Sequence, residues 1–205
     1  PRSTPIKSSA ASDVYKRQLT GRMPRYGLYL TENRRAQIKI TVEAGELTPL
    51  DYNTIGIITG KLAGAKIPAI YGLPQSATND DLKYLGASAA SSGSVALYHA
   101  DGITPEAILT DVFAGKAPEE EMVITRKDID DAAEKMTSTG AGEPQLAVVG
   151  CPHYSSEEVI RLARMIEGKK VADGKAFWVF TTAETESLME RMGLKAVLEE
   201  AGVMI

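Results

Sequence analysis

The sequence predicts an α/β protein in which helices cover both faces of mostly parallel sheets. Three features lead to this prediction. Short apolar runs bounded by Gly or Pro recur along the chain, such as 146–149 between Pro144 and Gly150. Amphipathic stretches of about ten or more residues separate these runs. Side chains with helix-capping spacing precede several of the amphipathic stretches, and strands that alternate with such helices form parallel, covered sheets.

The first part of the chain alternates predicted strands with predicted helices. In the run 36–43, Ile38, Ile40 and Val42 alternate with polar residues, which is typical of a strand with one buried face. Thr78 precedes a helical stretch that ends at Gly93, a residue type that favours helix ends. The predicted strands are 26–30, 36–43, 67–72, 94–98 and 122–125, and the predicted helices are about 54–62, 80–92, 105–113 and 127–136.

The remainder of the chain continues this alternation. A strand is predicted at 146–149, and Ser155 with Glu158 has the spacing of a capping box that begins an amphipathic helix. The run 176–181 predicts another strand, and a Glu-rich pair of helices follows it. The final run 203–205 reads as a strand after which a further connection is expected, so we interpret the sequence as a fragment.

Composition excludes several classes of partner and location. The 205 residues carry a formal net charge of -4, which argues against nucleic acid or an anionic membrane surface as a partner. No apolar run approaches the roughly 20 residues that span a bilayer. A single cysteine cannot form an internal disulfide, and no signal-peptide-like segment lies near the start, so we expect a cytoplasmic protein.

Residues 1–18 differ in composition from the rest of the chain. They are rich in Ser, Ala, Lys and Arg and have no sustained apolar period. We therefore interpret them as an unrelated tail that is disordered or artefactual, and we exclude them from the fold prediction.

Cys151 and His153 lie between a predicted strand and the helix that follows it. Open α/β sheets bind ligands at the carboxyl ends of their strands, and a nearby helix N-terminus favours a thiolate. Three interpretations stay open for this thiol: a metal or cluster ligand, a nucleophile that works with a base, or a buried residue without chemistry. One cysteine cannot hold a zinc site or an iron–sulfur cluster alone, so a cluster would need thiolates from outside this chain.

Five other polar residues lie at predicted strand ends or turns. His99 follows a predicted strand and is either a site residue or a strand-end cap. Thr181 and Thr182 either bind a carboxylate or phosphate or begin the next helix as its N-cap. Asn33 with Arg34 forms either an anion clamp or a solvated turn.

The segment Gly56–Lys61 is superficially similar to a phosphate-binding loop. It has one residue fewer between its glycines than that motif, and Leu62 stands where a Ser or Thr would bind magnesium. The sequence therefore predicts no phosphate loop here.

Four segments taken together resemble the large, catalytic subunit of aconitase X. The Gly-Cys-Pro-His sequence, followed by Ser and Glu, is specific when it is combined with the other three segments. The similarity extends from Leu19 to Ile205. The four segments are Leu19–Arg34, Ala87–Gly93, Val95–Ala107 and Gly150–His153.

This resemblance implies an aconitase-like three-layer α/β/α fold with mostly parallel sheets. The chain is expected to hold parts of two lobes, 19–117 and 118–205, with a boundary near Pro118. The implied activity is that of a hydro-lyase that dehydrates a small hydroxy acid, such as cis-3-hydroxy-L-proline or mevalonate 5-phosphate. The implied partner is a small swivelling subunit, or a fused domain, that closes the site.

The resemblance also implies an iron–sulfur cluster or an iron centre, with Cys151 as one ligand and His153 at its edge. The family's other cysteine ligands are not in this sequence, so this polypeptide alone is expected not to assemble a complete site. Two alternatives stay open: a non-catalytic module that binds an acidic metabolite, and a thiol enzyme. The expected site residues are Cys151 at the metal, His153 and His99 in catalysis, and Asn33, Arg34, Thr181 and Thr182 at the substrate.

Overall fold

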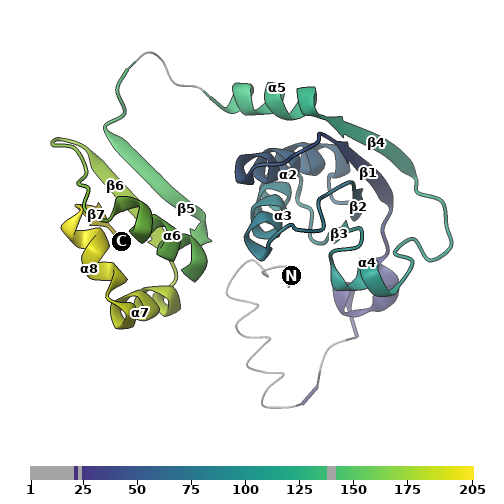
Figure 1. The fold of residues 1–205 in the computed structure, drawn as a ribbon. Coiled ribbons are helices and arrows are strands. Elements are labelled where there is room, and N and C mark those ends of the chain that lie inside the picture. Colours follow the sequence, from purple (N-terminus) through teal and green to yellow (C-terminus); the bar gives the residue numbers. More distant parts are fainter. Residues whose placement is uncertain (1–20, 23–24, 138–141) are drawn as a thin grey trace. The chain divides into compact units, whose positions relative to one another are not determined.

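The computed structural model describes residues 21–22, 25–137 and 142–205 (Figure 1). The prediction for the tail 1–18 lies outside these residues. The chain divides into two compact units, Pro1–Thr137 and Ser138–Ile205. Within the described ranges, every helix is too short or too polar to cross a membrane.

The first unit is built on a four-stranded sheet with the strand order β3-β2-β1-β4. All three strand pairs are parallel, as the alternating pattern predicts. Ile40 on β1 lies opposite Ile70 on β2 and Met122 on β4. The strands are β1 (Ile38–Glu43), β2 (Pro68–Tyr71), β3 (His99–Ala100) and β4 (Glu120–Thr125).

Three helices pack on the apolar face of this sheet (Figure 1). They are α2 (Pro49–Ala63), α3 (Asn79–Gly93) and α5 (Arg126–Met136). Each begins with a capping box, in which a Thr side chain and the Asp three residues later satisfy backbone N–H groups that the first turn leaves unpaired. The core that they enclose contains Ile38, Ile40 and Val42 of β1 with Ile55, Leu85 and Ile129 of the helices.

A smaller cluster lies on the other side of β2. Ala69 contacts Val112 and Phe113, which follow the short helix α4 (Pro105–Leu109), and Ala36 joins them. The backbone N–H of Ala36 donates to the Val112 carbonyl at 2.9 Å, so the α4 segment is attached to the start of β1.

Glycines allow α2 and α3 to pack at close range. A Cβ at Gly56 would lie 2.4 Å from the Leu85 carbonyl oxygen, and a Cβ at Gly60 would lie 2.6 Å from the Ala89 carbonyl oxygen. On the facing helix, a Cβ at Gly93 would lie 1.7 Å from the Gly60 carbonyl oxygen. The glycine spacing that is similar to a phosphate loop is therefore a helix-packing motif inside α2, and the prediction of no phosphate loop agrees with this placement.

The second unit contains a three-stranded parallel sheet with the strand order β5-β6-β7. Three helices pack on one face of it and share a core that includes Val159, Val179, Met189, Leu198 and Val203. The elements are β5 (Leu146–Tyr154), α6 (Ser156–Ile166), β6 (Ala176–Thr181), α7 (Ala183–Met192), α8 (Leu194–Glu200) and β7 (Val203–Met204).

The other face of this sheet carries exposed apolar side chains. Val148, Trp178 and Met204 are neighbours across the three strands, so they share that face. Among the described residues of the second unit, helices cover only the opposite face. These residues therefore form the sheet and one helical layer of the expected three-layer α/β/α fold. The exposed apolar side chains of this face are Leu146, Val148, Trp178, Phe180 and Met204.

Two predicted strands are wrong. Residues 26–30 contain no strand; the 3-10 helix η1 (Gly27–Tyr29) lies there, and a second 3-10 helix, η2 (Thr31–Arg34), follows it. Residues 94–98 are also not a strand, because Ser94 adopts a left-handed conformation with φ of 64° as the C-cap of α3. The chain pairs with β2 only from His99 onward, so His99 lies inside β3 and not after it.

The predicted boundary near Pro118 is also wrong. β4 follows Pro118, but it pairs along its whole length with β1, so it belongs to the sheet of the first unit.

Two predicted helices differ in extent. α2 begins at Pro49 because Thr48 and Asp51 cap it there, and α4 ends at Leu109, before Asp111 accepts a hydrogen bond from the Phe113 N–H.

Candidate functional site

A cluster of polar side chains lies beside β3 in the first unit. His99 is only 3% exposed, and its Nε2 lies 2.6 Å from the backbone carbonyl oxygen of Arg34. Its other ring nitrogen, Nδ1, lies 3.9 Å from Oε2 of Glu106. The second carboxylate oxygen of Glu106 forms an ion pair with the Arg34 guanidinium. The structure therefore brings together two predicted site residues, His99 and Arg34, through a third that was not predicted.

The turn between β3 and α4 determines where Glu106 lies. The Thr104 hydroxyl accepts a hydrogen bond from the Ala100 N–H at 3.0 Å and donates to the Ala100 carbonyl at 3.2 Å. Both residues are buried, so this turn is held from inside the unit. Glu106 then lies in the first turn of α4, two residues after Thr104.

Asn33 has a local partner. Its side-chain amide donates to the Gly27 carbonyl at 3.0 Å, which ties η2 back to η1. The solvated-turn interpretation therefore accounts for Asn33, whereas Arg34 takes part in the Glu106 ion pair.

The thiol of Cys151 is exposed in the second unit. The interpretation of this thiol as a buried residue is therefore wrong. Cys151 lies on the last part of β5, where the register with β6 shifts between Val149 and Tyr154. Because of this irregularity, Cys151 is not part of the regular pairing between β5 and β6. It lies at the carboxyl end of the strand, where ligands bind in parallel sheets.

Gly150 allows β5 and β6 to approach closely next to the thiol. Its φ is +105°, and a Cβ there would lie 2.1 Å from the Phe180 carbonyl oxygen. A residue with a side chain cannot occupy this position without moving β6, so the glycine sets the backbone path that presents Cys151.

The helix after the thiol begins as the sequence predicts. The Ser155 hydroxyl accepts a hydrogen bond from the Glu158 N–H at 3.2 Å, and the Glu158 carboxylate accepts one from the Ser155 N–H at 2.9 Å. This confirms the capping box. His153 is exposed between Cys151 and this cap, so its imidazole lies on the surface of the same strand end.

Thr181 and Thr182 lie at the carboxyl end of the neighbouring strand β6. The Thr181 hydroxyl donates to the Tyr154 carbonyl at 2.7 Å and so joins β6 to the end of β5. The Thr182 hydroxyl accepts a hydrogen bond from the Thr185 N–H at 3.3 Å, which makes Thr182 the N-cap of α7. Both hydroxyls therefore have structural partners.

The predicted site residues fall into two groups. Asn33, Arg34 and His99 belong to the first unit, whereas Cys151, His153, Thr181 and Thr182 belong to the second. No three His, Cys, Asp or Glu side chains in the described part of the chain are grouped so that they could hold a metal ion. Cys151 can thus supply one thiolate, and a cluster would need its other ligands from elsewhere.

Sequence reasoning missed Glu106, although a signal for it was present. The sequence Thr104-Pro105-Glu106 begins a helix directly after His99, and an acidic residue in a first helical turn is common because the helix dipole favours it. That rule explains Glu106 without a partner, so nothing in the local sequence pattern connects Glu106 with Arg34.

Comparisons with known proteins agree with the two-unit division. Residues 36–134 match the family described as aconitase X second domain, and residues 144–205 match the family described as aconitase X third domain. The two matches together cover most of the chain, and the gap between them contains the junction of the two compact units.

Several curated proteins are similar to nearly the whole chain. The phosphomevalonate dehydratase large subunit of Methanothermobacter thermautotrophicus is 41% identical over 192 residues, which is 91% of this chain and 45% of that protein. The corresponding subunit of Methanosarcina mazei is 40% identical over 81% of this chain and 39% of its own length. The cis-3-hydroxy-L-proline dehydratase of Pseudomonas aeruginosa is 34% identical over 91% of this chain and 33% of its own length.

A solved structure has the same fold. The crystal structure of Thermococcus kodakaraensis aconitase X in its holo-form superimposes with a TM-score of 0.79 at 28% identity. The match covers 93% of this chain and 48% of that one, so the chain spans half or less of the length of these relatives. Two successive domain matches, these identities and the shared fold lead to one conclusion: the chain belongs to the aconitase X family, and it carries the second and third domains of that family.

Proposed function

We propose that this chain is part of the catalytic subunit of a hydro-lyase that eliminates water from a small hydroxy acid. The observation that carries the proposal is the 41% identity with a dehydratase subunit over nearly the whole chain. Identities of 41% and 40% to phosphomevalonate dehydratases exceed the 34% to a cis-3-hydroxy-L-proline dehydratase. We therefore propose mevalonate 5-phosphate as the substrate, with cis-3-hydroxy-L-proline as the alternative.

The exposed thiol at the end of β5 supports a role for Cys151 as a metal ligand. A thiolate is the ligand that iron–sulfur clusters use, and the Cys151 thiol is accessible. An iron–sulfur cluster or iron centre would act as a Lewis acid on the departing hydroxyl. Cys151 would be one of its ligands, with the others contributed from outside the described residues.

The other predicted residues have the chemistry to bind and orient such a substrate. The Arg34 side chain is 37% exposed, and an exposed arginine can bind a carboxylate or a phosphate. The exposed His153 imidazole, near Cys151, is a candidate for substrate contact or proton transfer. His99 is buried with both ring nitrogens facing protein groups, so we propose that it positions Arg34 and does not contact the substrate.

A second polypeptide is part of the proposal. Five of the similar proteins are named large subunits, which implies a small subunit in those enzymes. We propose a matching small subunit for the enzyme that contains this chain, and we propose that it swivels to close the site around the substrate.

The activity is tested with the complete large subunit assembled with its small subunit under anaerobic conditions. We expect water elimination from mevalonate 5-phosphate, and a lower rate or none with cis-3-hydroxy-L-proline. The reverse preference would contradict the proposed substrate. Absence of elimination from both acids in an iron-loaded enzyme would reject the proposed reaction.

The ligand role of Cys151 is tested separately with Cys151→Ser in the same complex. We expect loss of bound iron and of the visible iron–sulfur absorbance, because a serine hydroxyl is a poor substitute for a thiolate. Glu157→Gln, an exposed change in the first turn of α6, is the control and should retain iron. Unchanged iron content in Cys151→Ser would reject the assignment. Covalent labelling of Cys151 by an alkylating substrate analogue, without dependence on iron, would instead support a thiol enzyme.

A further inference from the structure

We propose that Glu106 is a positioning residue that holds Arg34 and His99 together in one cluster beside β3. The three residues form a closed set of contacts, because Glu106 faces both of the others and His99 also contacts the Arg34 backbone. This inference rests on the proposed function, since it assigns to Glu106 the task of presenting Arg34 to an anionic group of the substrate.

The contacts determine which nitrogen of His99 carries a proton. The Nε2 atom lies 2.6 Å from the Arg34 carbonyl oxygen, and a carbonyl can only accept. Nε2 is therefore protonated, and it donates to Arg34. The Nδ1 atom faces the Glu106 carboxylate at 3.9 Å, so the same carboxylate lies between the imidazole and the guanidinium.

The ion pair leaves part of the Arg34 side chain exposed. Glu106 contacts Nη2 of Arg34, and the side chains of Arg34 and Glu106 are 37% and 33% exposed. The Nε atom of Arg34 is buried and has no hydrogen-bond partner within the described structure. Since a guanidinium has five N–H donors, one carboxylate does not satisfy it, and a second anion can bind to the exposed part.

Hydrogen bonds and burial support the backbone around His99 and Glu106. Thr104 fixes the turn that leads to Glu106, and the His99 ring is 3% exposed. Arg34 has a long and flexible side chain, so without the carboxylate its guanidinium would sample several orientations. Glu106 thus removes orientations that are not productive before the substrate binds.

The kinetic test uses Glu106→Gln in the complete two-subunit enzyme. Glutamine keeps the size of the side chain but loses its charge, so we expect KM to rise about tenfold with a smaller change in kcat. Glu106→Asp, which keeps the charge, should recover part of the affinity. The control is Glu121→Gln, which removes an exposed carboxylate 3.1 Å from Lys39 on the neighbouring strand and should change neither constant.

A second test does not depend on activity. In the complete enzyme, the imidazole signals of His99 are those that a His99→Asn variant loses from the ¹⁵N NMR spectrum. We expect these signals to show the Nε2-protonated form of His99. Adding Glu106→Gln should produce exchange broadening or a mixture of tautomers, whereas Glu121→Gln should not.

The two tests separate the possible failures. If the wild-type enzyme dehydrates neither acid, the proposed function fails, while the NMR spectrum still reports whether Glu106 orders His99. If KM is unchanged in Glu106→Gln while the wild-type enzyme is active, the positioning role is rejected. This holds even if the unfolding temperature or the His99 signals change, because Glu106 would then stabilise the fold only.

Discussion

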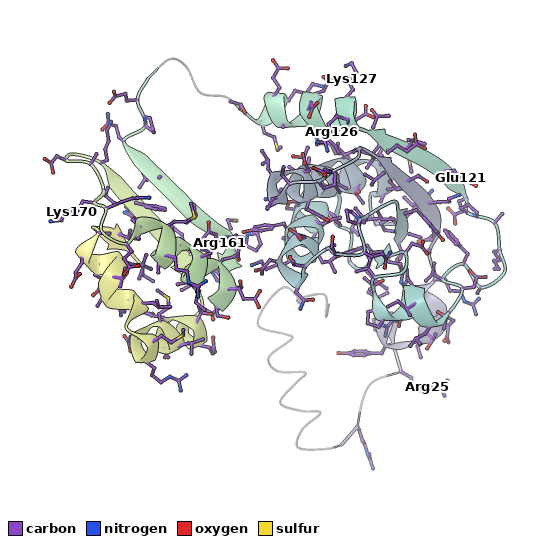
Figure 2. All side chains as sticks on the ribbon, viewed as in Figure 1. Arg25, Glu121, Arg126, Lys127, Arg161 and Lys170 are labelled. Atoms are coloured by element: carbon purple, nitrogen blue, oxygen red, sulfur yellow. The ribbon has the colours of Figure 1, made fainter. Side chains whose placement is uncertain are left out.

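Asp51 and Arg126 connect three segments of the first unit. Arg126 donates from Nη1 to the Asp51 carboxylate at 2.9 Å and from Nε to the Ala44 carbonyl at 3.1 Å. Figure 2 shows Arg126 at the start of α5. Asp51 also accepts a hydrogen bond from the Thr48 N–H at 2.7 Å, so the loop between β1 and α2 is attached to both helices.

This arrangement predicts a loss of stability in acid. Burial alone would raise the pKa of Asp51, but the hydrogen bonds from Thr48 and Arg126 outweigh it, so the pKa lies below the ordinary value of 3.8. A lowered pKa stabilises the folded state above the ordinary value, and this contribution is lost as the pH falls through the folded-state pKa. We therefore expect the unfolding temperature of the first unit to decrease below about pH 4.

The matching variant is Asp51→Asn, measured by thermal unfolding at a series of pH values. We expect it to cost about 1 to 2 kcal/mol at neutral pH and to weaken the acid dependence. Asp130→Asn is the control, because its carboxylate lies 3.8 Å from Arg126 but is 65% exposed. Equal acid dependence in Asp51→Asn and the unsubstituted chain would contradict the assignment.

Gly150 predicts a strong effect from one added methyl group beside Cys151. We expect Gly150→Ala to destabilise the second unit by roughly 2 kcal/mol or more, because φ is unfavourable and the Cβ would meet the β6 backbone. Gly168→Ala separates the two causes. Gly168 has a φ of +71° with no atom within 4 Å of its Cβ position, so only the conformational cost applies there. Equal losses in urea unfolding would show that the contact with Phe180 is unimportant.

At the scale of elements, the contact between α2 and α3 depends on residues without side chains. In the interior of a helix, Gly→Ala normally increases stability by about 1 kcal/mol. At Gly60 we expect the opposite sign, because the new Cβ would lie 2.6 Å from the Ala89 backbone oxygen and force the helices apart. Lys61→Ala, at an exposed position of the same helix, is the control and should have little effect on the unfolding free energy. A stabilising Gly60→Ala would contradict the close packing.

Helix starts were predicted more accurately than isolated strands. The capping boxes at Ser155 and Thr78 depend on residues within one turn of each other, so their sequence spacing identifies them. A strand exists only if another strand pairs with it. The apolar run 26–30 has no such partner and forms 3-10 turns, with Tyr26 80% exposed.

At the scale of the whole molecule, the two units have separate apolar cores. The residues of the first unit's cores lie between Ala36 and Ile129, and those of the second unit's core lie between Val159 and Val203. Each core therefore gains its stability from burial within its own unit. The only tryptophan, Trp178, is in the second unit, so its fluorescence reports the unfolding of that unit.

The two faces of the second sheet predict different mutational costs. We expect Val179→Ala, on the face that the helices cover, to cost about 1 to 2 kcal/mol in urea unfolding followed by Trp178 fluorescence. Val148→Ala, on the exposed face, should cost about 0.5 kcal/mol or less. Similar costs would show that the exposed face is covered in solution. Loss of hydrogen-exchange protection in β1 of the Val179→Ala variant would contradict separate cores.

The sequence by itself determined the α/β class, the alternation of strands and helices that predicts parallel sheets, and the capped helices. These features depend on periodicity and spacing among neighbouring residues. It also directed attention to Cys151, and the thiol is indeed exposed at a strand end. Only the tertiary structure decided that β4 joins the first sheet, that one face of the second sheet is left uncovered by its helices, and that Glu106 links Arg34 to His99. These features arise between residues far apart in the chain, where local patterns carry no information about which partner is present.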